Sequence, residues 1–255
     1  MKVSSKPRTF PLDAKSPKED HRVFGKVRDK PKAIVIYGPP GAGKGTQADL
    51  IARNFGFIHF DTGKYFEKIL YNPSFSKDPI IRRERKNFET GKLMTPSWVS
   101  KMVRIRTRKM AMAGMSIVFS GSPRTVYETK KLLPILEKLY GRENVIFFVI
   151  KVTESDSINR NSHRLVCSIC GSQFLYTGRK SLSLKGTCPF CGGKLFKRTL
   201  DKPEVIRLRI KEYESRTKPL FMELQSRGYK TFEVEGTLAP FKVFEIIKKR
   251  IYTGK

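Results

Sequence analysis

Nine residues have the types and the spacing of a loop that binds phosphate. They run from Gly38 to Thr46 with the sequence Gly-Pro-Pro-Gly-Ala-Gly-Lys-Gly-Thr, follow the apolar run Ala33–Tyr37, and precede an amphipathic helical pattern. The glycines let backbone N–H groups turn inward around a triphosphate, and the new helix offers the positive end of its dipole. Lys44 adds a mobile cation for a phosphoryl group in transfer. A strand, a loop and a helix in this order favour a phosphate-binding loop over an ordinary glycine-rich turn.

The four cysteines of the chain are spaced as two Cys-x-x-Cys pairs. Cys167 and Cys170 form the first pair, and Cys188 and Cys191 form the second. This spacing is typical of a four-thiolate zinc site, and the glycine after each pair allows the tight turn that aims two thiolates at one metal. Four protein ligands close the coordination shell, so we expect a structural metal, zinc or less often iron. Two disulfides are the alternative, which an intracellular location disfavours.

The chain is strongly basic, with 52 Lys and Arg residues against 23 Asp and Glu residues and a formal net charge of +29. Residues 1–32 hold ten basic and four acidic residues, so most of the excess belongs to the body of the chain. Binding of nucleotide phosphates takes only about half a dozen cations. The excess predicts either non-specific contact with a polyanion such as RNA or a cytoplasm whose proteins are generally basic, and the sequence leaves both open.

A chain of 255 residues, 39% of them hydrophobic, is long enough for one main domain with small inserted subdomains. No apolar run reaches the length of about 18 residues that a membrane span requires. The first twenty residues are polar and charged, without a hydrophobic stretch of signal-peptide type. We therefore expect a cytoplasmic protein with no membrane contact, and a monomer.

Short apolar runs alternate with longer helical patterns along most of the chain, which is typical of an α/β fold. Because helical crossovers join parallel neighbours, five such runs predict a doubly wound, five-stranded parallel sheet. The runs are Ala33–Tyr37, Phe57–Phe60, Ser116–Ser120, Val145–Val152 and Lys230–Val234.

Two intervals do not fit this alternation and are predicted to be insertions. Residues 61–99 are helical and basic, and residues 163–200 hold all four cysteines. Residues 1–30 are rich in Lys, Arg and Pro and lack periodicity, which predicts a flexible basic extension. The core domain is then assigned to residues 31–60, 100–162 and 201–255.

Three further motifs, taken with the loop, resemble those of the adenylate kinases, and the resemblance runs from about residue 32 to the C-terminus. The loop has Lys-Gly-Thr where most phosphate-binding loops have Lys-Thr or Lys-Ser. Asp61–Gly63 is similar to the family's Ser-Thr-Gly, Gly91–Thr95 to its Gly-Lys-Leu-Val-Thr, and Gly121–Thr125 to its Gly-Phe-Pro-Arg-Thr. The cysteine-bearing insert resembles the lid of the zinc-containing bacterial branch. The chain is identified as a divergent member of this family.

The resemblance implies a phosphotransferase that moves the γ-phosphoryl group of ATP to a nucleoside monophosphate, most simply AMP, with Mg²⁺ bound together with ATP. It implies a core that binds ATP and an insert at 61–99 that binds the monophosphate. It also implies a lid at 163–200, held together by zinc, which closes over both nucleotides and excludes water.

The family's catalytic cations carry over onto this sequence one by one. The resemblance implies that Lys44 contacts the β- and γ-phosphates, that Arg124 contacts the monophosphate, and that Arg160 packs on the adenine of ATP. Planar, permanently charged, bidentate donors suit the charge that spreads over the phosphoryl oxygens during transfer. The implied catalytic residues are Lys44, Arg124, Arg164, Arg198 and Arg209. The implied ATP-binding residues are Gly41, Gly43, Lys44, Gly45, Thr46, Arg160 and Arg164. The implied residues for the monophosphate are Thr62, Glu67, Met94, Gly121, Arg124, Glu128, Arg198 and Arg209.

Several positions depart from the family's pattern. The aspartate that orients the water shell of Mg²⁺ in the family is Ser120 here, and Asp61 is a nearby carboxylate that could compensate. The arginine that grips the AMP phosphate is Glu67, and Leu200 stands where the family has an aspartate near the lid hinge. Residues 201–204, Asp-Lys-Pro-Glu, resemble a capped helix start that would hold Arg209 in register.

The residue that selects the base also differs. The family reads adenine with a glutamine, and Glu128 stands at that position. A carboxylate offers only acceptors, which suits the N1–H and amino donors of guanine better than adenine. AMP ranks first because the other motifs match adenylate kinases. The alternatives are a kinase with guanine or relaxed preference, and a basic RNA- or ribosome-associated protein that keeps the fold with impaired catalysis.

Overall fold

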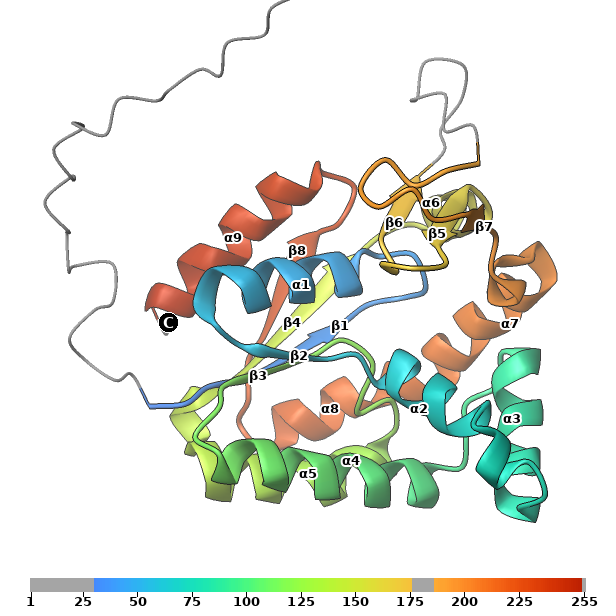
Figure 1. Ribbon diagram of the computed structural model, residues 1–255. Coiled ribbons are helices and arrows are strands. Elements are labelled where there is room, and N and C mark those ends of the chain that lie inside the picture. Colours follow the sequence, from blue (N-terminus) through green and yellow to red (C-terminus); the bar gives the residue numbers. More distant parts are fainter. Residues whose placement is uncertain (1–29, 176–185, 254–255) are drawn as a thin grey trace, which may run out of the picture. The chain divides into compact units, whose positions relative to one another are not determined.

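A five-stranded parallel sheet lies at the centre of the fold (Figure 1). All its pairings are parallel, and each strand overlaps one of the five predicted runs, so the predicted doubly wound sheet is confirmed. The strands are β1 (Ala33–Tyr37), β2 (Ile58–Phe60), β3 (Ile117–Phe119), β4 (Val145–Lys151) and β8 (Thr231–Glu235), in the order β2-β3-β1-β4-β8.

The computed structural model describes residues 30–175 and 186–253. The chain divides into two units, Met1–Lys30 and Pro31–Lys255, and the fold is that of the second. The extension predicted at residues 1–30 lies outside the described residues except for Lys30, and so does part of the predicted lid.

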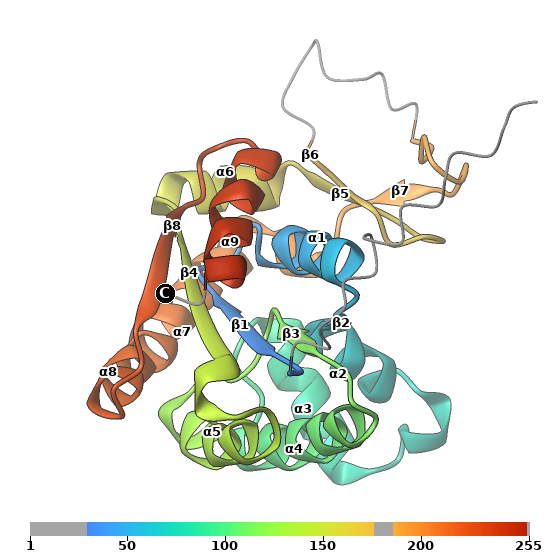
Figure 2. The same ribbon diagram turned by 90° about the vertical axis from the view of Figure 1, so that its left-hand side faces the viewer.

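Helices cover both faces of the sheet (Figure 2). Apolar side chains of α1 (Lys44–Phe55) and α9 (Pro240–Thr253) pack on one face. Those of α4 (Pro96–Met112), α5 (Val126–Tyr140) and α8 (Pro219–Ser226) pack on the other. The other helices are α2 (Thr62–Leu70), α3 (Pro79–Thr90), α6 (Glu154–Ser162) and α7 (Pro203–Glu212), with a π-helical turn at Tyr213–Thr217 and short 3-10 turns at Pro73–Phe75, Arg142–Asn144 and Thr199–Asp201.

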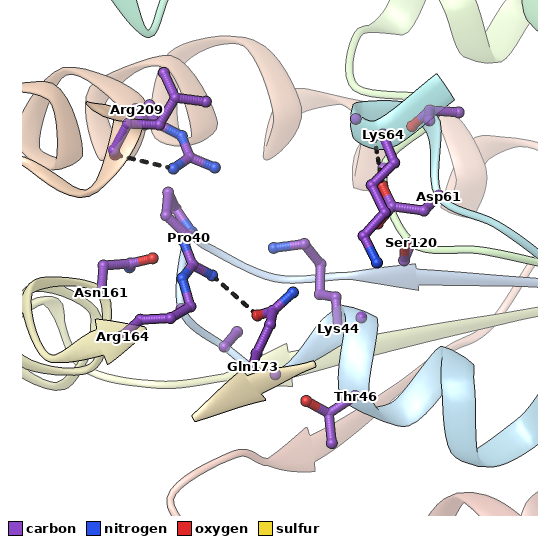
Figure 3. Close-up of a pocket in the computed structure, with 18 of the residues that line it drawn as sticks. Pro40, Lys44, Thr46, Asp61, Lys64, Ser120, Asn161, Arg164, Gln173 and Arg209 are labelled. Atoms are coloured by element: carbon purple, nitrogen blue, oxygen red, sulfur yellow. Dashed lines mark hydrogen bonds between the residues drawn. The ribbon is translucent and has the colours of Figure 1, made fainter. Parts of the chain in front are cut away.

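The order of the strands reverses at β1, which lies between β3 and β4. In doubly wound sheets a ligand binds at such a switch point, outside the carboxyl ends of the strands. The segments that follow β1, β2 and β3 meet there and bring Lys44, Asp61 and Ser120 to one pocket (Figure 3). The topology thus gathers residues that lie far apart in the sequence.

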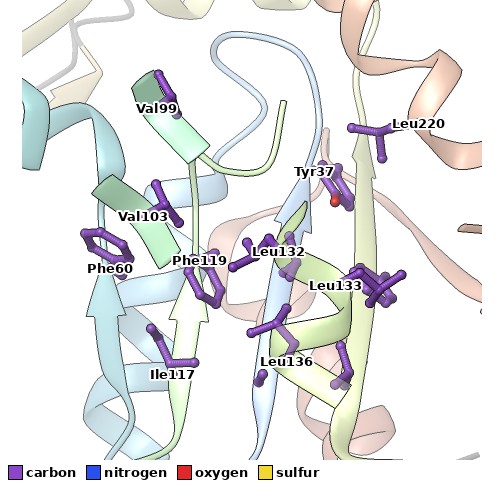
Figure 4. Close-up of a cluster of buried hydrophobic side chains, with 14 of the residues drawn as sticks. Tyr37, Phe60, Val99, Val103, Ile117, Phe119, Leu132, Leu133, Leu136 and Leu220 are labelled. Carbon is purple, nitrogen blue, oxygen red and sulfur yellow. The ribbon is translucent and has the colours of Figure 1, made fainter. Parts of the chain in front are cut away.

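β1 is apolar along its whole length because helices cover both of its faces, and no side chain of the strand is more than 4% exposed. Its side chains alternate between the layers: Ile34 and Ile36 pack with α1 and α9, and Val35 and Tyr37 pack with α4, α5 and α8. Leu132, Leu133 and Leu136 of α5 fill the second layer (Figure 4). The loop after β1 therefore starts from a strand that is fixed on both sides.

Between β2 and α4 the chain forms a helical segment that begins at a capped helix. Asp61 accepts a hydrogen bond from the backbone N–H of Lys64 at 3.1 Å and so caps α2. Glu84 of α3 is fully buried, and its carboxylate accepts the N–H of Thr95 at 2.7 Å and the hydroxyl of Thr95 at 2.6 Å. This contact ties α3 to the start of α4. Helix α4 runs through the boundary predicted at residue 99, and the limits of the insert stay a prediction.

A small antiparallel sheet follows α6. β5 (Arg164–Cys167) pairs with β6 (Gln173–Leu175) and with β7 (Leu195–Phe196). Its apolar cluster consists of two buried cysteines and Leu195, packed with Leu165 and Phe174. The described part of this segment buries few apolar side chains, and a cross-link would stabilise its fold.

Candidate active site

The loop Gly38–Thr46 joins β1 to α1 with three of its glycines at positive φ, as a phosphate-binding loop requires. Gly41 has a φ of 76°, and a Cβ built on it would lie 2.5 Å from Nδ2 of Asn161, so the loop is packed directly against α6. Lys44 Nζ donates to the carbonyl oxygens of Gly38 and Pro39, both at 2.7 Å. The ammonium group of Lys44 is therefore held against the loop whose backbone N–H groups would bind a phosphate.

A cavity of about 470 Å³ opens above this loop. The loop, the end of β3, α2 and the small cysteine-bearing sheet all contribute to its walls (Figure 3). Among the sequence-predicted site residues, the cavity is lined by Gly41, Gly43, Lys44, Gly45, Thr46, Thr62, Met94, Gly121, Arg124, Glu128, Arg160, Arg164, Arg198 and Arg209. The fold therefore brings these residues together at one place, whereas half-buried Glu67 is not among the residues that line it.

The cavity collects far more positive than negative charge. Among the described residues, eight lysines and arginines line it, against the two carboxylates of Asp61 and Glu128. Burial lowers the pKa of Lys44 well below its ordinary value, and the charges of nearby arginines lower it further. Burial and the same neighbouring cations lower the pKa of Arg209 to about 9. Because these like charges repel one another in a dry site, a polyanion is the ligand that would stabilise the arrangement.

One of the predicted clamp residues is already paired. Arg164 donates from Nε to Oδ2 of Asp201 at 3.0 Å and from Nη2 to Oδ1. The side chain of Asp201 is 1% exposed. The sequence predicted Asp201 in a capped helix start, and this is wrong: α7 begins at Pro203 after Lys202, without a side-chain cap, because the carboxylate is turned to Arg164.

Thr62, Gly121 and Arg124, three of the residues predicted to bind the monophosphate, lie close together. Their packing leaves no room for a side chain at Gly121. A Cβ there would lie 2.3 Å from Thr62 Oγ1 and 3.2 Å from Arg124 Nη2. Thr62 Oγ1 is buried and has no hydrogen-bond partner among the described residues. Arg124 donates from Nε to the carbonyl oxygen of Gly121 at 2.7 Å, and burial lowers its pKa. An unpaired hydroxyl beside a buried guanidinium is a suitable place for an anionic group.

Glu128 is 4% exposed, and its carboxylate is engaged locally. Oε2 accepts the backbone N–H of Arg124 at 2.9 Å, and Oε1 accepts the hydroxyl of Thr125 at 3.1 Å. Thr125 in turn caps α5 by accepting the backbone N–H of Glu128. Burial raises the pKa of this carboxyl. The Thr-x-x-Glu spacing resembles that of a capping box and is the sequence signal for these contacts, although Glu128 accepts the N–H of Arg124 and not that of the N-cap residue Thr125.

Two residues behind the wall of the cavity, Asp49 and His59, were not predicted. His59 at β2 has its Nε2 atom 2.7 Å from Ser120 Oγ and its Nδ1 atom 2.7 Å from Asp49 Oδ1. No local spacing announces this chain of contacts, because the three residues come from α1, β2 and the end of β3. The pairing of β2 with β3 brings His59 close to Ser120, and α1 brings Asp49 to His59.

The four cysteines form a second, separate cluster. Their Sγ atoms all lie within 4.8 Å of one another. The Sγ atoms of Cys167 and Cys191 are 3.4 Å apart and those of Cys170 and Cys188 are 3.7 Å apart, and all four cysteines are free. Zn–S bonds of about 2.3 Å in a tetrahedron place sulfurs about 3.8 Å apart, whereas a disulfide needs about 2.05 Å. The cluster can therefore bind a metal ion through four thiolates, and the alternative of two disulfides is not observed.

Among the described residues, none of the helices has the length and apolar character needed to cross a membrane.

Comparison with known proteins agrees with the geometry of the cavity. The model of the family described as adenylate kinase matches residues 36–229. The adenylate kinase of Thermosipho melanesiensis is 34% identical over 206 residues, which cover 80% of this chain and 92% of that protein. That of Carboxydothermus hydrogenoformans is 32% identical over 222 residues, covering 86% and 98%, and that of Methanothrix thermoacetophila is 33% identical over 189 residues, covering 73% and 83%. The chain belongs to the adenylate kinase family.

Proposed function

We propose that the protein transfers the γ-phosphoryl group of ATP to AMP and so forms two molecules of ADP. The observation that carries this proposal is the convergence of cations, most of them half-buried, on one cavity that is lined both by the phosphate-binding loop and by the Thr62, Gly121 and Arg124 cluster. The relatives named adenylate kinase support the same reaction. In this transfer a phosphate oxygen of AMP attacks the γ-phosphorus, and the bond from that phosphorus to the β–γ bridging oxygen breaks.

The residues of the cavity have different roles in the reaction according to their positions. The loop N–H groups and Lys44 bind the phosphates of ATP, and Arg124 with Thr62 binds the phosphate of AMP. Arg209 and its neighbouring arginines stabilise the charge that spreads over the oxygens of the transferred group. Their mutual repulsion before substrate binding is relieved by the bound phosphates, and it favours the transition state to the extent that the redistributed charge then lies closest to these cations. Arg160 packs on the adenine of ATP.

Mg²⁺ bound with ATP neutralises charge and draws electrons from the phosphates. Oxygen ligands suit this ion, and Ser120 and Asp61 supply a hydroxyl and a carboxylate in the wall of the cavity. We assign zinc to the cluster of four cysteines, because a four-thiolate set with tetrahedral spacing suits zinc and leaves no open position for chemistry. The zinc then holds the small sheet that contributes Gln173 and Phe174 to the cavity.

The two alternatives to AMP phosphorylation are not favoured. The acceptor oxygens of Glu128 are engaged with Arg124 and Thr125, so the carboxylate that suggested guanine already has partners within its own helix cap. The cavity keeps Lys44 and the five arginines that the family pattern assigns to it, although Glu67 replaces a sixth arginine, and a protein without catalysis would have no need of them. Non-specific contact of the basic surface with RNA, a monomeric state and a cytoplasmic location stay predictions.

The test is a coupled assay of ADP formation with ATP, Mg²⁺ and each of the four nucleoside monophosphates. We expect AMP to give the highest kcat/KM. Arg209→Ala should lower kcat by about 10²-fold or more, because it removes charge stabilisation from a dry site. Arg207→Ala is the matched control: this arginine lies two residues away on the exposed side of α7 and should leave the rate unchanged. A higher kcat/KM with GMP, or no turnover by the wild type, would overturn the proposal.

A further inference from the structure

Asp49, His59 and Ser120 form a continuous chain of contacts that ends at the wall of the cavity. The ring of His59 has Nδ1 at 2.7 Å from Asp49 Oδ1 and Nε2 at 2.7 Å from Ser120 Oγ. The side chain of His59 is 11% exposed, Ser120 is 7% exposed, and Asp49 at the outer end is open to solvent. Ser120 lines the cavity. The series of contacts therefore connects the exposed Asp49 with the site.

The ionised carboxylate of Asp49 determines which atoms donate and which accept in the two hydrogen bonds of His59. The hydrogen bond from His59 lowers the pKa of Asp49, which keeps the carboxylate ionised and able only to accept. In the neutral ring Nδ1 therefore carries the proton, and Nε2 presents a lone pair. The hydroxyl proton of Ser120 is then donated to Nε2. Both lone pairs of the Ser120 oxygen stay available to the cavity, and the oxygen acts as an acceptor.

We propose that Asp49 and His59 are positioning residues that fix Ser120 as an acceptor for the hydration shell of the divalent cation bound with ATP. The inference rests on the proposed function. A free serine hydroxyl offers a donor as readily as an acceptor, and a donor repels the outward-pointing hydrogens of a metal-bound water. A serine whose proton is committed to His59 presents only lone pairs. Asp49, His59 and Ser120 together thereby provide the hydrogen-bond acceptor for a metal-bound water that a single aspartate at position 120 would provide.

Asp61 is another oxygen donor in the wall of the cavity that could take this role. Its Oδ1 atom already accepts the backbone N–H of Lys64 at the start of α2, so the carboxylate is partly engaged as a helix cap. Ser120 has no such second partner among the described hydrogen bonds. The orientation of the Ser120 hydroxyl is set by His59 alone, and this makes His59 the residue to test.

The experiment measures metal binding without turnover. Free and bound Mn²⁺ are distinguished by electron paramagnetic resonance while Mn²⁺ is titrated into the protein with the non-hydrolysable analogue AMP-PNP. His59→Phe and Ser120→Ala should each raise the half-saturating Mn²⁺ concentration about 10-fold, the usual effect of losing a partner that orients a ligand. The double variant should lose no more than either single variant, because both remove the same acceptor. His163→Phe, an exposed histidine bonded to the carbonyl of Asn159, is the matched control and should bind as the wild type does.

A second set of variants separates positioning from a structural role. Ser120→Asp introduced into His59→Phe should restore Mn²⁺ affinity, because a carboxylate is an acceptor without help; a merely structural role of His59 would not be rescued in this way. Asp49→Asn should weaken Mn²⁺ binding less than His59→Phe, because an amide can turn and accept or donate. Affinity for AMP-PNP without metal should stay within about two-fold in all of these variants.

Three results would overturn the inference. One is an unchanged half-saturation point in His59→Phe while Ser120→Ala raises it. Another is an equal loss of AMP-PNP affinity with and without metal, which would place the defect in the fold of the loop. The last is a phosphoserine at Ser120 in the intact mass after incubation with ATP, which would make the serine a nucleophile activated by His59.

Discussion

Replacing Asp201 by asparagine tests the idea that the cavity is short of negative charge. Asp201 is 1% exposed and holds Arg164 through two parallel hydrogen bonds. Asparagine keeps the shape but carries no charge, and its amide can accept from only one of the two N–H groups. Arg164 would then be an uncompensated cation close to Lys44 and Arg209, whose pKa values its charge already lowers.

The expected size of the effect follows from burial. Removing one partner of a buried ion pair costs about 3–5 kcal/mol. The side chain of Arg164 is 14% exposed and reaches some water, so the free energy of unfolding should fall by about 3 kcal/mol, at the lower end of that range. For a chain of this size the loss corresponds to a Tm lower by roughly 6–12 °C.

Chemical denaturation followed by the fluorescence of Trp98 measures the change in the free energy of unfolding. Saturating ATP should narrow the gap between Asp201→Asn and the wild type, because the phosphates supply the missing anion to Arg164. Arg164→Gln combined with Asp201→Asn should be more stable than Asp201→Asn alone, since no unpaired charge is left. Glu204→Gln removes an exposed carboxylate three residues away and should cost less than about 1 kcal/mol. A loss below about 1 kcal/mol in Asp201→Asn, or a double variant less stable than the single one, would refute the reasoning.

Three further predictions concern the loop, the cysteines and the arginines. Lys44→Ala and Arg124→Ala should each lower turnover by about 10²-fold or more in the ADP assay, and near-normal turnover in either would contradict the assigned roles. Freshly purified protein should contain one equivalent of zinc by elemental analysis, and Cys170→Ser should lower both zinc content and Tm; less than about half an equivalent of metal would be the contrary result. At pH 9 the binding of ATP should take up protons, because bound phosphate raises the pKa of Arg209 from about 9 and that of Lys44 from its lowered value. The share of this uptake that comes from Arg209 should be lost at pH 7, where that arginine is already protonated before ATP binds. Calorimetry in two buffers of different ionisation enthalpy measures this uptake, and proton release at pH 9 would have the wrong sign.

The sheet could be predicted because each strand carries its own evidence. The runs at β1 and β4 are apolar at nearly every position, as strands buried on both faces must be. The loop after β1 could be predicted for the same reason: its glycines and lysine are consecutive, and their chemistry needs no other part of the chain. The cysteine cluster also followed from spacing, since two Cys-x-x-Cys pairs can surround one ion wherever the subdomain lies.

The side-chain roles that the sequence did not predict correctly depend on contacts between distant elements. Asp201 was assigned to a helix cap because its neighbours in sequence suggested one, whereas its partner Arg164 is 37 residues away. Glu128 was interpreted as a base-reading residue, whereas its carboxylate is bonded to Arg124 and Thr125 at the start of its own helix. In both cases a carboxylate had two available roles, and only the fold decides which partner lies closer.

Ser120 illustrates why a departure from a family pattern cannot be judged at a single position. Alone, the loss of a carboxylate at the end of β3 predicts a weaker hold on the metal. The parallel pairing of β2 with β3 places His59 opposite Val118, close to the end of the strand, and α1 places Asp49 against the other side of the ring. A carboxylate is then present at Asp49, further from the cavity than one at position 120 would be. It acts on the metal's water shell only by fixing, through His59, the direction of the Ser120 hydroxyl proton. Substitution at any of the three positions would therefore alter how the metal is held without changing a residue that contacts a phosphate.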